Sequence, residues 1–286
     1  MLKLLPPIRI HCWGGFGSQL CAWALYADIE RKFQNRFTSL VFHSSGITRR
    51  EQAPFSLPGA SNSLFIDDFV SNRKNNKNIY YLIHTKQTIK SLLKNTGFYA
   101  EVNTTYDYNN LKPIVCEIRG HYANREISNY ALELILQEIQ KYNFSKNYLR
   151  QDIDSLALHY RLGDLLNNEI KSFIPAENII KFINSFSSIW KINDIDVFSD
   201  SGSKAAESLG PLELNIQIVD VSPINVINSC LDYKYFIGTN SKLTIWIVML
   251  RLFRNPDSFN AVPLQIKSEI EKMRPNIRDL DNLIYY

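Results

Sequence analysis

Four short segments combine glycine, hydroxyl and charged residues directly after apolar runs that are predicted as β-strands. They are Gly14-Gly15-Phe16-Gly17-Ser18-Gln19, His159-Tyr160-Arg161-Leu162-Gly163-Asp164, Phe198-Ser199-Asp200-Ser201-Gly202 and Gly238-Thr239-Asn240-Ser241-Lys242-Leu243-Thr244. In doubly wound α/β sheets, ligands bind at the carboxyl ends of the strands. Helix-start N–H groups, hydroxyls and an arginine fork all donate hydrogen bonds to anions, so these residue types favour a phosphate-bearing ligand.

Each segment also has a purely structural interpretation. Arg161 presents a planar fork of donors suited to a diphosphate, or it pairs with Asp164 and braces the loop. The glycines at 14–17 match neither GxGxxG nor a Walker loop, and an ordinary tight turn is the alternative. Asp200 could bind a nucleobase or ribose, or Asp200 or Ser201 could cap the next helix. Ser241 could help to hold a phosphate or serve as a helix N-cap.

Strand-like and helix-like segments alternate along most of the chain. The predicted strands are 8–13, 38–42, 114–118, 155–159, 195–198, 216–219 and 235–237, and the predicted helices are 19–33, 129–141, 175–190, 203–209, 223–230, 241–253 and 265–272. This alternation favours parallel sheets covered on both faces. We expect one doubly wound unit in the second half of the chain and the start of another in the first. Residues 44–78 are predicted as long loops.

The composition bounds the class of protein. A chain of 286 residues, 45% of them hydrophobic, is long enough for two modest domains. The net charge of +4 is too small and dispersed for nucleic-acid binding, but it suits a phosphate-bearing ligand or weak attraction to an anionic membrane surface. No apolar run approaches the ~20 residues that span a bilayer. Four scattered cysteines suggest neither a zinc site nor disulfides, which favours a cytoplasmic compartment.

The motifs, taken in order, resemble those of the α1,2-fucosyltransferases. Residues 14–20 resemble the opening Gly-x-Leu/Phe-Gly-Asn-Gln of that family, and residues 120–124 its mid-chain Gly-Tyr-aromatic-Gln. Residues 159–164 are similar to its His-x-Arg-Arg-Gly-Asp, which α1,6- and protein O-fucosyltransferases share more loosely. Ser199-Asp200 matches its strand-end Ser-Asp. The list is completed by Asn228-Ser229-Cys230 with Ile237-Gly238-Thr239-Asn240-Ser241, which resemble its Met-x-x-Cys and Ile-x-x-Asn-Ser, and by Trp246 near its tryptophan pair.

The resemblance runs from about residue 8 to residue 255 and implies a GT-B architecture, in which two Rossmann-like α/β domains face each other across a cleft. The acceptor-side domain would span residues 1–148 and the donor-binding domain residues 149–286. The implied reaction moves L-fucose from GDP-fucose to a glycan hydroxyl with inversion, without a metal or cofactor. The implied acceptor is an oligosaccharide or lipid-linked glycan of O-antigen or capsule synthesis, handled in the cytoplasm or peripherally at the inner membrane face.

The functional residues of the family carry over onto matching positions. Arg161 occupies the position assigned to the β-phosphate of the donor, and Arg161 and Asp164 are the expected catalytic pair. Asp164 or His121 would be the general base, although holding the Arg161 loop is an equally good role for Asp164. The acceptor side would include His121 and Tyr122. The expected donor-binding residues are Gly15, Phe16, Gly17, Ser18, Gln19, His159, Arg161, Ser199, Asp200, Asn240 and Ser241.

Three departures from the family pattern keep other functions open. Ser18 replaces an asparagine, Leu162 replaces the second arginine, and Lys242-Leu243-Thr244-Ile245 replaces Ser/Thr-Phe-Ser-Trp. Phosphate binding carries over better than the identity of the sugar and base. The alternatives are another nucleotide sugar on the same fold and a catalytically silent nucleotide-binding homologue. Asp194-Ile195-Asp196 has the spacing of a metal-binding Asp-x-Asp motif but is predicted as the entry to a buried strand.

Overall fold

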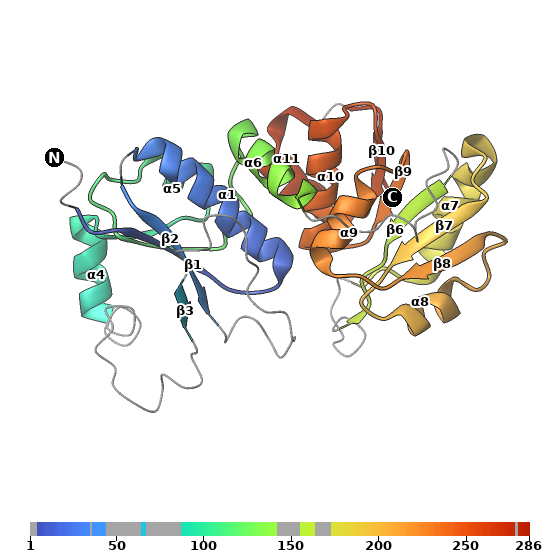
Figure 1. Cartoon of the computed structure of the whole chain (residues 1–286), viewed down its shortest axis with the longest axis horizontal. Coiled ribbons are helices and arrows are strands. Elements are labelled where there is room, and N and C mark those ends of the chain that lie inside the picture. The colour runs from blue at the N-terminus through green and yellow to red at the C-terminus, as the bar shows by residue number, and fades with distance from the viewer. Residues whose placement is uncertain are drawn as a thin grey trace. The chain divides into compact units, whose positions relative to one another are not determined.

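The chain forms two compact α/β units, each built on its own parallel sheet (Figure 1). The computed structural model describes residues 5–34, 36–43, 64–66, 87–141, 155–163, 173–277 and 280–286. Unit 1 comprises Met1–Glu138 and unit 2 comprises Ile139–Tyr286. The domain boundary expected between residues 148 and 149 lies in 142–154, outside the described residues.

Unit 1 is built on a five-stranded sheet with the order β3-β2-β1-β5-β4, in which each neighbouring pair is parallel. Its strands are β1 (Ile8–Cys12), β2 (Thr38–His43), β3 (Leu64–Ile66), β4 (Tyr99–Glu101) and β5 (Glu117–Arg119). Its helices are α1 (Phe16–Lys32), α4 (Gln87–Thr96), α5 (Thr105–Asn109) and α6 (Asn129–Gln140). β1 is therefore the central strand, and the turn that follows it leads directly into α1.

Unit 2 is built on a six-stranded parallel sheet with the order β11-β10-β9-β6-β7-β8. Its strands are β6 (Ser155–His159), β7 (Asp194–Phe198), β8 (Asn215–Val219), β9 (Tyr235–Gly238), β10 (Phe259–Val262) and β11 (Leu283–Tyr285). Its helices are α7 (Ala176–Trp190), α8 (Gly202–Leu209), α9 (Pro223–Cys230), α10 (Lys242–Arg254) and α11 (Lys267–Met273), with short 3-10 turns η6 (Leu264–Ile266) and η7 (Pro275–Ile277). The chain runs outward from β6 to β8, then returns to β9 and runs outward again. The switch point of this doubly wound sheet lies between β6 and β9.

The cores explain why these segments form these elements. The two central strands of unit 2, β6 and β9, are buried along their whole length, as expected for a parallel sheet covered on both faces. Helix α10 is buried from Thr244 to Leu252, and its apolar side chains point all round the helix, which is typical of an interior helix. Asp196 is also fully buried and accepts a hydrogen bond from the Tyr233 hydroxyl, so Asp194-Ile195-Asp196 is the expected structural strand.

The predicted fold class, α/β with two Rossmann-like units, is confirmed. Most predicted elements agree within two or three residues, and the clearest displacement is β5, which begins at Glu117 rather than at Ile114. Six elements were not predicted: β3, α4, β4, α5, β10 and β11. Of the predicted loop over residues 44–78, the structure describes only the segment that forms β3, and the remainder lies outside the described residues.

The four cysteines are all reduced and buried: Cys12, Cys21 and Cys116 in unit 1 and Cys230 in unit 2. Burial raises the pKa of the Cys116 and Cys230 thiols above the ordinary value. In the described parts of the chain, no helix combines the length and apolar character needed to cross a bilayer.

Gly120, the residue after β5, is required by the backbone of unit 1. Its φ is +149°, and a Cβ at this position would lie 1.9 Å from the Val102 carbonyl oxygen. We expect Gly120→Ala to lower the free energy of unfolding by about 1–3 kcal/mol or more, because both the backbone strain and the clash must be relieved. Urea denaturation measures the loss. Gly210→Ala is the matched control, since Gly210 has helical φ and ψ and its nearest Cβ neighbour is 3.3 Å away. Equal losses in the two variants would contradict this account.

Candidate functional site

Three of the predicted ligand-binding segments meet at one edge of the unit 2 sheet. β6 lies between β9 and β7, and the register pairs His159 with Gly238 on one side and with Phe198 on the other. The segments that follow these three strands therefore leave the sheet side by side. They begin with Tyr160-Arg161, Ser199-Asp200 and Thr239-Asn240 respectively. This edge includes the switch point between β6 and β9, where doubly wound sheets bind ligands.

Thr239 joins the ends of β6 and β9 and fixes the backbone of Arg161. The Thr239 N–H and hydroxyl both donate to the His159 carbonyl, at 3.0 and 3.1 Å. The same hydroxyl oxygen accepts a 2.9 Å hydrogen bond from the Arg161 N–H. The Arg161 side chain is half-buried. The segment that carries the guanidinium is thus held to the sheet on both sides of the switch point.

Asp200 holds the turn that follows β6. Its Oδ1 accepts hydrogen bonds from the Leu162 and Gly163 N–H groups, at 2.9 and 3.0 Å. A Cβ on Gly163 would lie 2.4 Å from the Asp200 Oδ2, so glycine permits this close approach. Of the two residues predicted to cap α8, Ser201 is at the N-cap position, but its side chain makes no capping hydrogen bond. Ser199 instead accepts a 3.1 Å bond from the Ser201 N–H.

Leu162, the departure from the family motif, is a core residue. Its side chain is 1% exposed and belongs to the apolar cluster with Leu158, Ile179 and Ile195. An arginine at this position would have to be buried, which is costly for an unpaired charge.

His159 lies beneath the first turn of α10. Its Nδ1 is 2.8 Å from the Thr244 Oγ1, and the Ser241 hydroxyl donates to the same oxygen at 3.3 Å. His159 Nδ1 and Thr244 Oγ1 therefore share one hydrogen bond, whose direction follows the tautomer of the imidazole. Ser241 also accepts a 3.1 Å bond from the Thr244 N–H, which confirms its predicted N-cap role. Asn240 is half-buried between these groups and the end of β9.

Burial, with a smaller contribution from the nearby charge of Arg161, lowers the pKa of His159 to about 4, although Asp200 opposes the shift. Above the unfolded-state pKa of ~6.5 the imidazole is neutral in both states, and the native state has its full stability. As the pH falls towards 4, the unfolded chain binds the proton and the folded chain does not. We therefore expect a stability loss of about 3 kcal/mol between pH 7.5 and 4 from this group.

The measurement is urea denaturation across that pH range for the wild type and for His159→Gln, whose amide can still pair with the Thr244 hydroxyl. The variant should lose this part of the acid sensitivity. Parallel pH curves for the two proteins would show that His159 does not cause it.

In unit 1, the predicted glycine segment forms the turn between β1 and α1. Gly14 has φ +89°, which favours glycine, and Gly15 is the N-cap of α1 without a side-chain cap. The Gly15 carbonyl accepts bonds from the Ser18 and Gln19 N–H groups, at 2.9 and 3.2 Å. The buried Gln19 side chain donates to the Gly14 carbonyl at 3.2 Å. Phe16 and Gly17 are also buried. These bonds support the tight-turn interpretation, and donor binding here stays a prediction.

The two predicted acceptor-side residues lie in different environments. His121 is exposed, and its backbone N–H donates to the Asn103 Oδ1 at 3.0 Å. Tyr122 has φ +55° and is 2% exposed, and its hydroxyl lies 2.6 and 3.1 Å from the His11 and Ile118 carbonyls. Tyr122 therefore braces β1 against β5, and its predicted contact with an acceptor stays a prediction.

Asp164, the other predicted catalytic residue, lies outside the described residues, so its proposed pairing with Arg161 stays a prediction. Within the ranges that the structure describes, no group of three or more His, Cys, Asp and Glu side chains is arranged to hold a metal ion.

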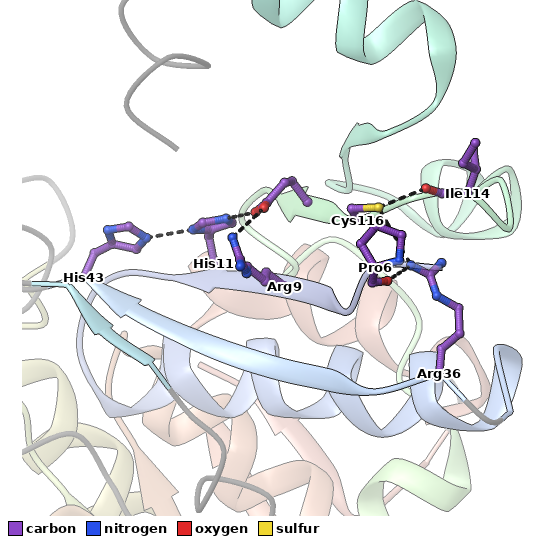
Figure 2. Close-up of polar contacts among 8 residues, drawn as sticks. Pro6, Arg9, His11, Arg36, His43, Ile114 and Cys116 are labelled. Carbon is purple, nitrogen blue, oxygen red and sulfur yellow. Dashed lines mark hydrogen bonds and ion pairs between the residues drawn. The ribbon is translucent and has the colours of Figure 1, made fainter. Parts of the chain in front are cut away.

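Sequence reasoning missed a buried polar network in unit 1, shown in Figure 2. His11 on β1 lies between two partners: its Nδ1 is 2.8 Å from the His43 Nε2, and its Nε2 is 2.7 Å from the Glu117 Oε2. Arg9 donates to the other Glu117 oxygen at 3.2 Å. The alternation of Arg9, His11 and Trp13 along an otherwise apolar central strand was the available signal.

No protein-family model matches the chain, and no curated protein matches it either. Solved structures with a similar fold include POFUT1 in complex with GDP, with a TM-score of 0.43 and 11% sequence identity. The match covers 90% of this chain and 98% of that chain. A family 9 glycosyl transferase from Veillonella parvula has a TM-score of 0.46 at 9% identity, with 90% of this chain and 80% of that chain covered. The E. coli heptosyltransferase WaaC with ADP has a TM-score of 0.46 at 11% identity, with 98% of this chain and 92% of that chain covered.

Proposed function

We propose that this chain is a glycosyltransferase that uses a nucleotide-sugar donor, and that Arg161 binds the diphosphate of that donor at the carboxyl edge of the unit 2 sheet. The observation that carries the proposal is the meeting of three motif segments at the ends of β9, β6 and β7, with Arg161 at the switch point. Their order along the chain resembles that of the α1,2-fucosyltransferases. A phosphate here would face the start of α10, whose N–H groups and dipole favour an anion.

The chemistry of the proposed reaction explains why a fixed cation is needed. The acceptor oxygen attacks the anomeric carbon, the bond from that carbon to the phosphate oxygen breaks, and the electron pair stays on the departing diphosphate. Arg161, with its backbone held by Thr239, would meet this developing charge without reorganising during the reaction. Attack from the face opposite the leaving group would invert the anomeric configuration. No step of this proposal uses a metal ion or cofactor.

The finer proposal is that the donor is GDP-fucose and the acceptor a glycan of surface-polysaccharide synthesis. Its support is the fucosyltransferase-like order of the motifs, including Ser199-Asp200 and Asn240-Ser241. The buried Leu162 is the specific observation that favours a second candidate, a different nucleotide sugar on the same fold, because the second arginine of the family motif is replaced by a core side chain.

A thermal-shift series with GDP, UDP, CMP and dTDP tests the class and the base together. We expect GDP to raise the unfolding temperature selectively, since binding to the native state stabilises it by RT ln(1 + [L]/Kd). Selective stabilisation by another nucleotide would discard the fucosyl proposal and keep the glycosyltransferase one. No stabilisation by any of the four would contradict the fucosyl proposal and exclude sugars carried by these four nucleotides as donors.

Slow release of fucose from GDP-fucose in the absence of an acceptor separates an enzyme from a silent homologue. A chain that binds GDP but neither hydrolyses GDP-fucose nor transfers the sugar to any glycan in a panel would be a nucleotide-binding protein that has lost turnover.

A further inference from the structure

The face of the unit 1 sheet that carries His11 is unusual for a parallel sheet. Neighbouring parallel strands normally present apolar side chains on both faces. Here Arg9 and His11 are two positions apart on β1, so their side chains lie on the same face of the sheet. Arg9 is directly paired with Glu117 on β5. His43 at the end of β2 is 0% exposed, His11 2% and Glu117 7%. A buried polar cluster that breaks the local pattern but is hydrogen-bonded throughout is typical of a functional site.

The hydrogen bonds of this cluster have one consistent direction. The Glu117 carboxylate accepts from Arg9 through one oxygen, and its other oxygen accepts from the His11 Nε2, which therefore carries a proton. The His11 Nδ1 is then an acceptor, and the His43 Nε2 must donate to it. Burial, the largest influence, lowers the pKa of His11, although Glu117 opposes the shift, and the imidazole is neutral near pH 7. The carboxylate thus fixes the tautomers of both histidines.

Trp13 connects this buried cluster of side chains to the surface of unit 1. The Trp13 ring stacks on the His43 ring, with 4.3 Å between centroids and an interplanar angle of 9°. The guanidinium of Arg119, on β5, lies 4.3 Å from the centroid of the Trp13 ring. Trp13 and Arg119 are both partly exposed, and Trp13 directly precedes the Gly14-Gly15 turn. An aromatic ring with a guanidinium over it, at the carboxyl end of a central strand, offers apolar contact at the ring edge and planar hydrogen-bond donors to a sugar ring.

We propose that Glu117, His11 and His43 form a tautomer-fixed chain of positioning residues, which holds Trp13 and Arg119 in place as a contact surface for the acceptor sugar. The proposal rests on the function proposed above. The three buried residues act through Trp13 and do not touch the ligand. A proton added at the His11 Nδ1 would place N–H groups on both facing nitrogens and break their bond. Among the described residues, the charged groups that act on His11 are Arg9 on β1 and Glu117 and Arg119 on β5.

The first experiment reads the tautomers without reference to function. Long-range ¹H–¹⁵N spectra of the full chain report the protonated nitrogen of each of its five histidines, and His11→Gln and His43→Phe assign two of them. We expect Nε2–H tautomers at both positions near neutral pH. In Glu117→Gln the side-chain amide can donate as well as accept, so the tautomers should become mixed. An Nδ1–H tautomer at His11 in the wild type, or no change in Glu117→Gln, would overturn the proposal.

The second experiment measures sugar binding with a glycan array in the presence of GDP, followed by titration of the best-bound glycan. We expect Trp13→Leu and Glu117→Gln to weaken glycan binding at least about tenfold and to leave GDP affinity unchanged. His43→Phe keeps a ring against Trp13 without the hydrogen bond and should lose less than Trp13→Leu. Glu133→Gln is the control, because Glu133 lies in the same unit but is exposed on α6, where its carboxylate accepts from Gln137 on the same helix.

Glycan binding that is equal in Trp13→Leu and the wild type, or absent from the wild type while GDP binds, would overturn the proposed contact surface. If GDP fails to bind the wild type, the proposed function fails, and the tautomer experiment still decides on the chain of positioning residues.

Discussion

Arg161→Ala should reduce the turnover of GDP-fucose about 10²–10³-fold or more, while the protein stays folded. A preorganised donor to the developing charge contributes on the order of 3–4 kcal/mol to the transition state. The measurement is the rate of GDP release without an acceptor, with GDP affinity determined separately by calorimetry. Since binding and turnover are measured apart, loss of the diphosphate contact can be told from loss of the fold.

Arg161→Lys is the informative companion variant. Lysine keeps the charge but not the planar fork, so it should restore little of the rate. Full activity in Arg161→Lys would indicate a simple charge effect. A soluble Arg161→Ala protein with near wild-type turnover would remove the central residue from the proposed site.

The largest expected effect on stability belongs to Arg251, near the end of α10. Its side chain is 1% exposed and donates to the Asn260 Oδ1 at 2.7 Å and to the carbonyls of Cys230, Tyr233, Lys234 and Phe259. Burial lowers the pKa of this guanidinium to about 10. Arg251→Ala would leave several buried acceptors unpaired, so we expect the free energy of unfolding to fall by about 3–5 kcal/mol.

Arg254, one turn further along α10, provides the matched control. Its guanidinium donates to Asp232 at 2.7 Å, but its side chain is 40% exposed. Surface pairs of this kind contribute ~0–1 kcal/mol, so Arg254→Ala should be nearly neutral in urea denaturation. Similar losses in both variants would mean that the buried network adds little beyond ordinary helix packing.

The sequence predicted unit 2 better than unit 1 for a physical reason. The inner strands of unit 2 are rich in apolar residues, and Ser241 marks the start of α10 with an ordinary N-cap. In unit 1, α4 has no fully buried residue, and β4 is only three residues long, too short to show an alternating pattern. Short strands that depend on partners far along the chain, such as β10 and β11, are fixed by tertiary pairing that local patterns do not contain.

The candidate site shows the same division. The placement of Arg161 and Ser241 at strand ends followed from the alternation of elements. The role of Asp200 as the acceptor for the Leu162 and Gly163 N–H groups did not, because a bond across 37 or 38 residues leaves no local trace. The pairing of His11 with His43 and Glu117 was hidden for the same reason, since the partners are 32 and 106 residues away.

The buried thiols have a practical consequence. A thiol that is shielded and whose pKa is raised reacts poorly with alkylating reagents, so labelling of the native chain should follow local opening rather than surface chemistry. Cys230 lies in unit 2 and the other three cysteines lie in unit 1. The molecule therefore carries one natural reporter for its proposed donor-binding half and three for the other. Which half opens first under denaturant can be read by mass spectrometry without adding a probe.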